Sequence, residues 1–196
     1  MDATSITPSP QALRALAHPT RLRMLGILRI DGPATATTLA TRLGLNTGAT
    51  SYHLRQLGQH GFVVEDTERG NGRDRWWKAA HRTTVTETVQ PESPEEAETV
   101  AAYLQAVAMV RTQTLQRSVE EVPLLPKEWA DAVTYSDWLI RLSPERAKAL
   151  MDKIEELVRA EAAEAPEADA TDESAVQYVV QLNGFPYPGH AGGTDA

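Results

Sequence analysis

Two short amphipathic helices with only a brief turn between them constrain this chain more than any other feature of its sequence. The first is predicted over residues 35–43, with Gly44 after it in the position that favours a left-handed residue. The second is predicted over residues 47–60 and is stopped by Gly61. This spacing predicts a helix-turn-helix.

A hairpin is predicted directly after the second helix. Residues 62–67 and 73–79 have the composition of strands, and the Asn71-Gly72 pair between them is the strongest short signal for a hairpin turn. At least one of the adjacent Trp76 and Trp77 is expected to face the core, because successive strand residues point to opposite faces. The hairpin therefore predicts a wing.

Two further helices are predicted upstream, one from Pro10 and one opened by Pro19. In the second of these, the three arginines Arg21, Arg23 and Arg29 are expected to face solvent. These elements and the hairpin all fall within residues 10–90, which predicts a winged helix-turn-helix head. Residues 1–9 are polar and are predicted to be a flexible tail.

A long helix is predicted over residues 95–121, within a segment (91–122) that is assigned to dimerisation. Its apolar side chains follow one side: Ala97, Val100, Leu104, Val107, Leu115 and Val119. Such a narrow stripe is either intramolecular core or a seam between two copies, and a helix of this length favours the seam.

The last part of the chain predicts a small β/α unit over residues 123–188, with a flexible tail over residues 189–196. Residues 133–142 are expected to form a strand or an extended segment, and residues 175–182 a strand. Between them, Ser143-Pro144-Glu145 combines an N-cap, a first-turn proline and an acidic residue, which predicts a helix start. The fold class is therefore α+β, mainly α.

Charge is distributed unevenly along the chain. The net charge is -8, yet residues 1–90 carry +4 and residues 91–196 carry -12. A basic head suits DNA, because neutralising phosphate is the part of DNA affinity that does not depend on sequence. The sequence lacks cysteine, a long apolar run and a secretory signal, so a cytoplasmic protein without disulfides or membrane contact is expected.

The exposed face of the second helix of the helix-turn-helix carries side chains suited to the major groove. They are Asn46, Thr47, Gly48, Ser51, Tyr52, Arg55, Gln56 and Gln59. Arg55 is the first candidate for base recognition because a guanidinium can bond two acceptors of guanine, and Gln56 could do the same for adenine. Arg69, Arg73 and Arg75 lie on or near the wing tip and are expected to contact the DNA backbone or minor groove, setting affinity more than sequence preference.

Aromatic residues are concentrated in the last third of the chain. They are Trp129, Tyr135, Trp138, Tyr178, Phe185 and Tyr187. These rings are either the core of the small β/α unit or the lining of a pocket for an apolar or aromatic effector.

Three runs of this sequence resemble the winged-helix regulators of the arsenic-repressor (ArsR) type: LRALAHPTRLRMLGIL, TTLATRLGLNTGATSYHLRQLGQHGFV and RDRWWKA. The resemblance covers residues 11–80. The positions that fall on the recognition-helix pattern of that family are Ser51, His53, Leu54, Leu57, Gly61 and Val63. The resemblance implies a DNA-bound homodimer, usually a repressor, that an effector releases.

The chain departs from the metal-sensing members of that family. Those members place a thiolate pair in the helix before the recognition helix, where residues 35–40 of this chain offer no ligand. A second family site uses histidines and carboxylates on the dimer helix, and residues 95–121 contain no histidine. No metal and no cofactor are therefore expected.

These patterns together predict a homodimeric, sequence-specific transcriptional regulator, a repressor released by a small non-metal effector. The alternative is a winged helix that binds protein instead of DNA, which the acidic body favours and the arginine-rich wing opposes. An enzyme is not expected, because no nucleophile–base pair, metal cluster or phosphate-binding loop is visible. None of the five histidines has a partner at metal spacing, and His53 is expected to pack between helix and hairpin.

Overall fold

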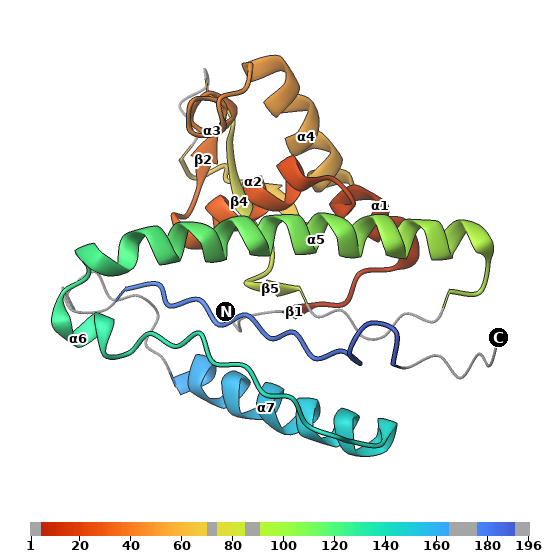
Figure 1. Ribbon diagram of the computed structural model, residues 1–196. Coiled ribbons are helices and arrows are strands. Elements are labelled where there is room, and N and C mark those ends of the chain that lie inside the picture. The colour runs from red at the N-terminus through yellow and green to blue at the C-terminus, as the bar shows by residue number, and fades with distance from the viewer. Residues whose placement is uncertain (1–4, 70–73, 85–90, 165–175, 191–196) are drawn as a thin grey trace. The chain divides into compact units, whose positions relative to one another are not determined.

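The computed structural model describes residues 5–69, 74–84, 91–164 and 176–190 (Figure 1). The chain divides into two compact units, one ending at Leu125 and the other beginning at Pro126. The described residues are mainly helical with two small sheets, so the predicted α+β class is confirmed. No helix within these ranges is both long enough and apolar enough to cross a bilayer.

The helices of the first unit lie within one or two residues of their predicted bounds. They are α1 (Pro10–Leu16), α2 (Pro19–Ile30), α3 (Ala36–Leu43), α4 (Thr47–Gln59) and α5 (Pro94–Glu121), followed by the short 3-10 helix η1 (Val122–Leu124). Each α-helix begins at a side chain that accepts a hydrogen bond from a backbone N–H two or three residues later: Ser9, His18, Thr35, Asn46 and Ser93. Gly44 ends α3 with a φ of 65°, as the sequence predicted.

The wing is a three-stranded antiparallel sheet in the order β2-β4-β3. β3 (Val63–Glu65) pairs with β4 (Trp76–Ala79), which confirms the two predicted strands. β2 (Ala34–Thr35) pairs with the other edge of β4 and was not predicted. Because β2 leads directly into α3, the sheet ties that helix to the wing. The Asn71-Gly72 turn lies outside the described residues.

A second sheet joins the start of the chain to the end of the wing. β1 (Ser5–Ile6) pairs in parallel with β5 (Thr83–Thr84), and Pro8 is buried beside them. The prediction of a flexible tail over residues 1–9 is therefore wrong from Ser5 onward. The strand could not be recognised from the neighbouring residues, because the strand it pairs with lies far away in sequence.

The core of the head is closed by α5. The fully buried side chains include Leu13, Leu16, Met24, Leu25, Leu39, Leu54, Leu57, Phe62 and Val63. α5 runs beneath α1 and α2 and contributes the buried Tyr103 and Ala106 (Figure 1). Of the predicted apolar stripe, Val100 and Val107 pack on this core, whereas Leu104 is about half exposed. The stripe thus serves the intramolecular core along part of its length.

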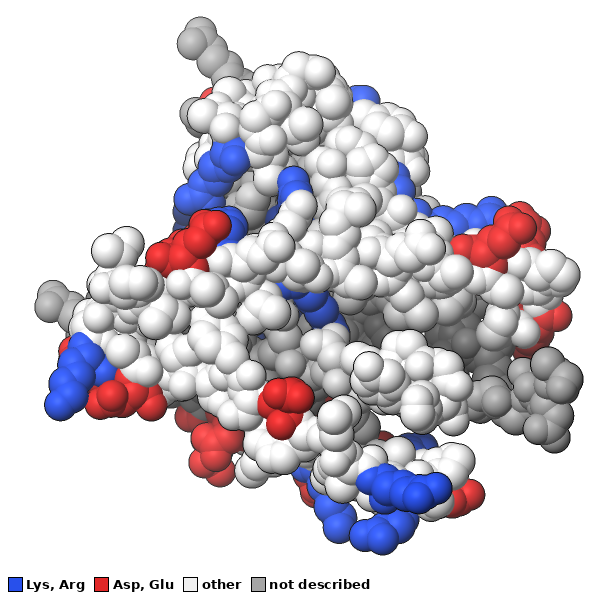
Figure 2. Space-filling model, viewed as in Figure 1, with Lys and Arg blue, Asp and Glu red and all other residues white. Residues whose placement is uncertain are grey.

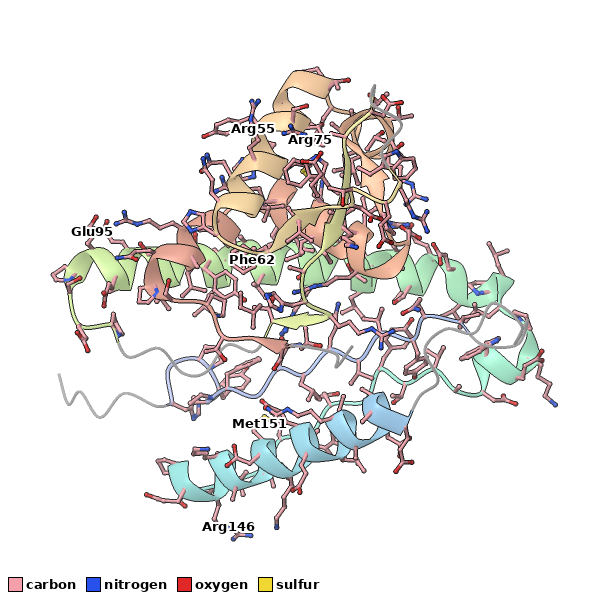
Figure 3. The ribbon with its side chains drawn as sticks, turned by 180° about the vertical axis from the view of Figure 1, so that it is seen from behind. Arg55, Phe62, Arg75, Glu95, Arg146 and Met151 are labelled. Atoms are coloured by element: carbon pink, nitrogen blue, oxygen red, sulfur yellow. The ribbon has the colours of Figure 1, made fainter. Side chains whose placement is uncertain are left out.

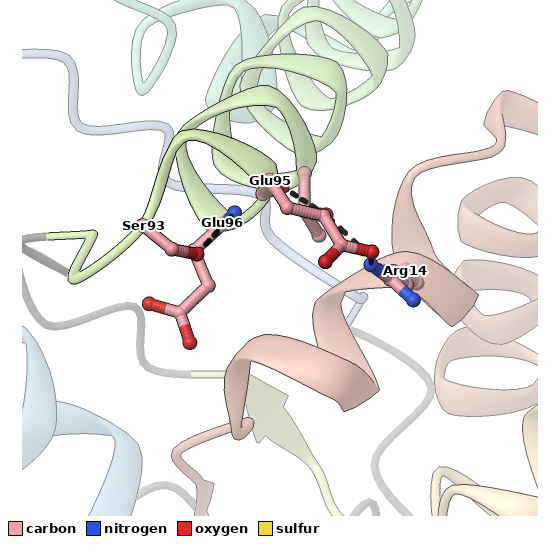
Figure 4. A network of polar contacts seen from close by, with 5 residues as sticks. Arg14, Ser93, Glu95 and Glu96 are labelled. Atoms are coloured by element: carbon pink, nitrogen blue, oxygen red, sulfur yellow. Dashed lines mark hydrogen bonds and ion pairs between the residues drawn. The ribbon is translucent and has the colours of Figure 1, made fainter.

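Polar contacts at the start of α5 fasten it to α1 (Figure 4). Ser93 Oγ accepts from the backbone N–H of Glu96 at 3.2 Å, which caps the helix. Arg14 of α1 forms an ion pair with Glu95, and its Nε donates to Thr99 Oγ1 at 3.4 Å. The α5 helix is therefore part of the head and not a separate segment.

Arg29 points inward, although it was expected to face solvent. Its Nε donates to the carbonyl oxygen of His81 at 2.9 Å, and one terminal nitrogen donates to Thr84 Oγ1 at 2.8 Å. Burial lowers the pKa of Arg29 to about 10, with Tyr103 acting in the opposite direction, so the group stays charged at neutral pH. Arg29 thus ties α2 to β5.

Replacing Arg29 with methionine is expected to lower the free energy of unfolding by about 1–3 kcal/mol, because two acceptors lose their donor while the apolar stem is kept. Urea denaturation followed by circular dichroism measures the loss. Arg42→Met is the control: its guanidinium pairs with Asp31 on the surface, where an ion pair contributes about 1 kcal/mol at most. Equal losses in the two variants would contradict a structural role for Arg29.

The second unit contains α6 (Lys127–Ala130) and α7 (Pro144–Glu164). Ser143 Oγ accepts from the backbone N–H of Arg146 at 3.4 Å, which confirms the predicted helix start. The two predicted strands are wrong, because residues 133–142 and 176–182 have no regular secondary structure. Strand-forming residues need a packed face and a hydrogen-bonded neighbour, and no described residue of this unit is fully buried.

Candidate nucleic-acid interface

The polar residues of α4 lie opposite its buried face. Thr50, Leu54 and Leu57 are buried in the core of the head. The predicted contact residues share the other side of the helix: Asn46, Thr47, Gly48, Tyr52, Arg55 and Gln59 are exposed, and Ser51 and Gln56 are half-buried. Packing of the apolar side thus presents the polar side to solvent as one broad face.

Arg55 is a long side chain of this face that pairs with none of the residues the structure describes. Asn46 Oδ1 accepts from the backbone N–H of Ala49 at 2.8 Å and so caps the helix. Gln56 Nε2 donates to Gln59 Oε1 at 3.0 Å, which uses one of its two N–H donors. Arg55 makes no hydrogen bond or ion pair with another described residue, so its donors are available to a ligand.

Arg55 and Arg75 line one hollow between α3, α4 and the wing (Figure 3). The hollow has a volume of about 260 Å³ and is lined by Thr35, Ala36, Thr37, Ser51, Arg55, Asp74, Arg75 and Trp77. Two guanidinium groups and the start of α3 make it electropositive, while Asp74 adds one carboxylate. The contribution of α3 to this hollow was not predicted, because Thr35 was expected to be the first residue of that helix and is its N-cap.

The wing arginines already lie against groups of their own chain. Arg75 Nε is 3.3 Å from Glu65 Oε2, and its guanidinium lies 5.9 Å from the ring centroid of Trp77. Its side chain is still 60% exposed. The charge of Arg75 is thus partly compensated before any phosphate arrives. Arg73, predicted beside it, lies outside the described residues.

Asp66 anchors the other side of the wing. Asp66 is 4% exposed. Its carboxylate forms ion pairs with Lys78, whose Nζ is 3.2 Å away, and with Arg69, whose Nε is 3.6 Å away. The Arg69 guanidinium also lies 6.0 Å from the ring centroid of Trp76. Arg69 therefore holds the wing together as well as adding charge to its surface.

Trp77 packs the wing onto α4. Its ring borders the core, and a Cβ atom placed on Gly58 would lie 3.1 Å from it. The prediction that at least one of the paired tryptophans faces the core is confirmed. This packing fixes the wing arginines relative to α4.

On the face drawn in Figure 2, Lys and Arg side chains are spread over the head above α5, and Asp and Glu side chains gather near the ends of α5. On this face the head therefore presents scattered cations among uncharged residues, and residues 1–90, which include it, carry a net charge of +4.

The ring of His53 lies beside His18, the residue that caps the start of α2. Its ring centroid is 4.7 Å from that of His18 and 5.6 Å from that of Tyr52. His18 Nδ1 accepts from the backbone N–H of Thr20 at 3.2 Å, whereas the buried Nδ1 of His53 has no hydrogen-bond partner among the described residues. Burial lowers the pKa of both histidines. The charge of Arg21 lowers that of His18 further, and the charges of His18 and then Arg21 lower that of His53.

These lowered pKa values predict that acid destabilises the head. Between the folded and the ordinary histidine pKa, the unfolded chain binds more protons, so stability is complete above about pH 7 and falls as the pH decreases through the ordinary histidine range near 6.5. Urea denaturation between pH 8 and 5.5 measures this slope. His18→Asn keeps a capping oxygen and removes one titrating ring, so it is expected to flatten the slope. An unchanged slope in that variant would count against the histidine pair as the cause.

Of the aromatic residues in the last third of the chain, only some contact one another. Trp129 and Tyr178 stack with ring centroids 6.4 Å apart, and the Tyr178 hydroxyl donates to the carbonyl oxygen of Ala132 at 2.7 Å. Tyr135, Trp138, Phe185 and Tyr187 are exposed. The interpretation of these rings as the core of the unit is therefore wrong, and the aromatic effector pocket stays a prediction.

Comparison with known proteins gives matches to the head. The family described as a helix-turn-helix domain matches residues 16–66, from the end of α1 to the end of the β3 strand. A stretch of 66 residues, 34% of this chain, is 39% identical to the HTH-type transcriptional regulator NmtR of Mycobacterium tuberculosis. That stretch covers 54% of NmtR, so the chain spans about half the length of the curated relative it matches.

A solved structure, the transcriptional regulator Tm0710 from Thermotoga maritima, matches 74% of this chain and 76% of its own. The two are 11% identical and superpose with a TM-score of 0.30, a likeness too distant to support any argument.

Proposed function

We propose that this chain is a sequence-specific DNA-binding transcriptional regulator of the ArsR type acting in the cytoplasm, because residues 16–66 match a helix-turn-helix domain and a stretch of 66 residues is 39% identical to a transcriptional regulator. The observation that carries the proposal is the exposed polar face of α4, whose Arg55 is unengaged and lines a hollow shared with Arg75. A helix held by its apolar side, with short polar groups at its start and a guanidinium about two turns later, suits entry into the major groove.

The proposed regulator is a homodimer formed along α5. Support comes from apolar side chains on the solvent side of that helix, where Leu104, Leu115 and Val119 are 53%, 46% and 53% exposed. Apolar groups in a row on one helix favour burial against a second copy. A twofold dimer would place two α4 helices about 34 Å apart, one turn of DNA, on a palindromic operator. We further propose repression that a small non-metal effector relieves.

A protein-binding winged helix is the second candidate. The compensation of Arg75 by Glu65 and the carboxylate of Asp74 in the hollow favour it, because both weaken the attraction of this surface for phosphate.

Selection of duplexes from a fragment library by the full chain tests the proposal at two salt concentrations. We expect a palindromic site with half-sites about 10 base pairs apart, and an affinity that falls steeply with salt. Sedimentation of the complex is expected to give two chains per site. Failure to retain duplex DNA above the non-specific level at low salt would contradict DNA binding and favour the protein-binding alternative.

A further inference from the structure

The second unit contains a hollow between α7 and the segment that leads into it. Its volume is about 330 Å³, and it is lined by Ile140, Leu142, Arg146, Ala149, Leu150 and Lys153. The volume lies at the lower end of the range for small-molecule sites, about 300–1,000 Å³. Four of the six lining residues are apolar, and the other two are cations.

The spacing of these residues explains how they gather. Arg146, Ala149, Leu150 and Lys153 recur at the intervals of one face of a helix, and Ile140 and Leu142 close the hollow from the preceding segment. Arg146 points to the opposite side of α7 from Met151 (Figure 3). Met151 lies against Gly184, where a Cβ atom would collide with its sulfur. One side of α7 is thus occupied by its own unit, and the side with the cations is open.

The cations of α7 differ in their partners. Two are neutralised within the helix: Lys148 Nζ lies 2.7 Å from Asp152, and Arg159 lies 2.8 Å from Glu155. Arg146 and Lys153 form no ion pair with a described residue, and no carboxylate lines the hollow. Because the two cations that border the hollow are the unpaired ones and no carboxylate lines it, the hollow is suited to an anion.

The separation of the two cations limits which anion fits. Seven residues of helix place Arg146 and Lys153 roughly 10 Å apart along the axis. A single carboxylate can bond only one of the two cations directly. The second cation would then lie about a Debye length from it and contribute little to binding. A molecule that uses both needs two anionic ends and an apolar middle lying over Leu150, Leu142 and Ile140.

We propose that this hollow binds a medium-chain α,ω-dicarboxylate, with one carboxylate on the Arg146 guanidinium, the other on the Lys153 ammonium and the methylene chain over the apolar floor. Charge-assisted bonds at both ends fix the position, and burial of the chain adds affinity. This ligand is the effector of the regulator, and that role rests on the proposed function. The binding of the ligand to the hollow does not depend on the proposed function.

Calorimetric titration of the full chain with azelate, a nine-carbon dicarboxylate, tests the site without DNA. We expect saturable binding of one azelate per chain. Arg146→Gln and Lys153→Gln are each expected to weaken it about tenfold or more, the effect of losing one charge-assisted contact. Lys148→Gln and Arg159→Gln remove the same charge from the same helix and are expected to change affinity less than twofold. Circular dichroism shows whether all four variants keep the helix.

Three outcomes would overturn the assignment: no saturable azelate binding, equal weakening by the control variants, or nonanoate, with one carboxylate, binding as tightly as azelate. Addition of azelate to the operator complex is expected to release the unmodified chain but not Arg146→Gln. If the chain stayed on DNA with azelate bound, the effector role would be wrong, but the binding site would still be supported. A chain that binds azelate but never retains DNA would overturn the proposed function alone.

Discussion

Replacing Phe62 with alanine is expected to lower the free energy of unfolding of the head by about 3–5 kcal/mol. Phe62 is the largest of the fully buried side chains. It lies between α4 and β3, and its backbone makes hydrogen bonds to both α4 and the residue after β4. Its N–H donates to the carbonyl oxygen of Leu57 at 3.0 Å, and its carbonyl oxygen accepts from the N–H of Ala80 at 3.0 Å. Truncation leaves a cavity where helix, wing and core meet, in a domain whose whole stability is of the order of 5–15 kcal/mol.

Chemical denaturation of the full chain, followed by circular dichroism, measures this loss. Val64→Ala is the matched control, because Val64 is two positions from Phe62 along the chain and 42% exposed. Its effect is expected to stay within about 0.5–1 kcal/mol. If Phe62→Ala lost no more than Val64→Ala, the junction of α4 and the wing would not be the centre of the core.

Replacing Arg55 with alanine is expected to reduce the preference for the selected operator over random duplex about 5- to 150-fold, equivalent to the 1–3 kcal/mol of one bidentate base contact. The reason is its place on the exposed face of α4, where it has no hydrogen bond or ion pair to a described residue. Competition binding with operator and random duplex at one salt concentration measures the preference.

Two control variants separate base recognition from general charge. Arg75→Ala is expected to weaken binding to both duplexes alike, because a cation at the edge of the wing serves the backbone. Arg117→Ala removes the same charge from α5, far along the chain from α4, and is expected to change neither. If Arg55→Ala weakened both duplexes by the same factor, Arg55 would be a phosphate contact.

The helices of the head could be predicted closely because their signals are local. Pro19 opens α2, Gly44 ends α3, and apolar residues at helical spacing mark the buried side of α4. The same periodicity placed Arg55 on the exposed side of its helix. The candidate interface was thus largely visible in sequence, apart from the α3 residues that complete the hollow.

The ion-pair partners of the wing arginines could not be predicted from the sequence. Glu65 and Asp66 were predicted only as strand residues, yet they engage Arg75 and Arg69 of the wing. Whether a cation is compensated depends on pairing across the sheet and not on the neighbouring letters, so the charge of the wing was overestimated.

The sequence by itself determined the order of helices, their caps and the hairpin, because each depends on residues within one or two turns of each other. Only the tertiary structure decided the pairing of β1 with β5, the addition of β2 to the wing and the inward position of Arg29. It also decided that residues 133–142 and 176–182 remain without strands. Each of these outcomes depends on which distant segment supplies a hydrogen-bonding edge or a buried face, and that is a property of the packed chain.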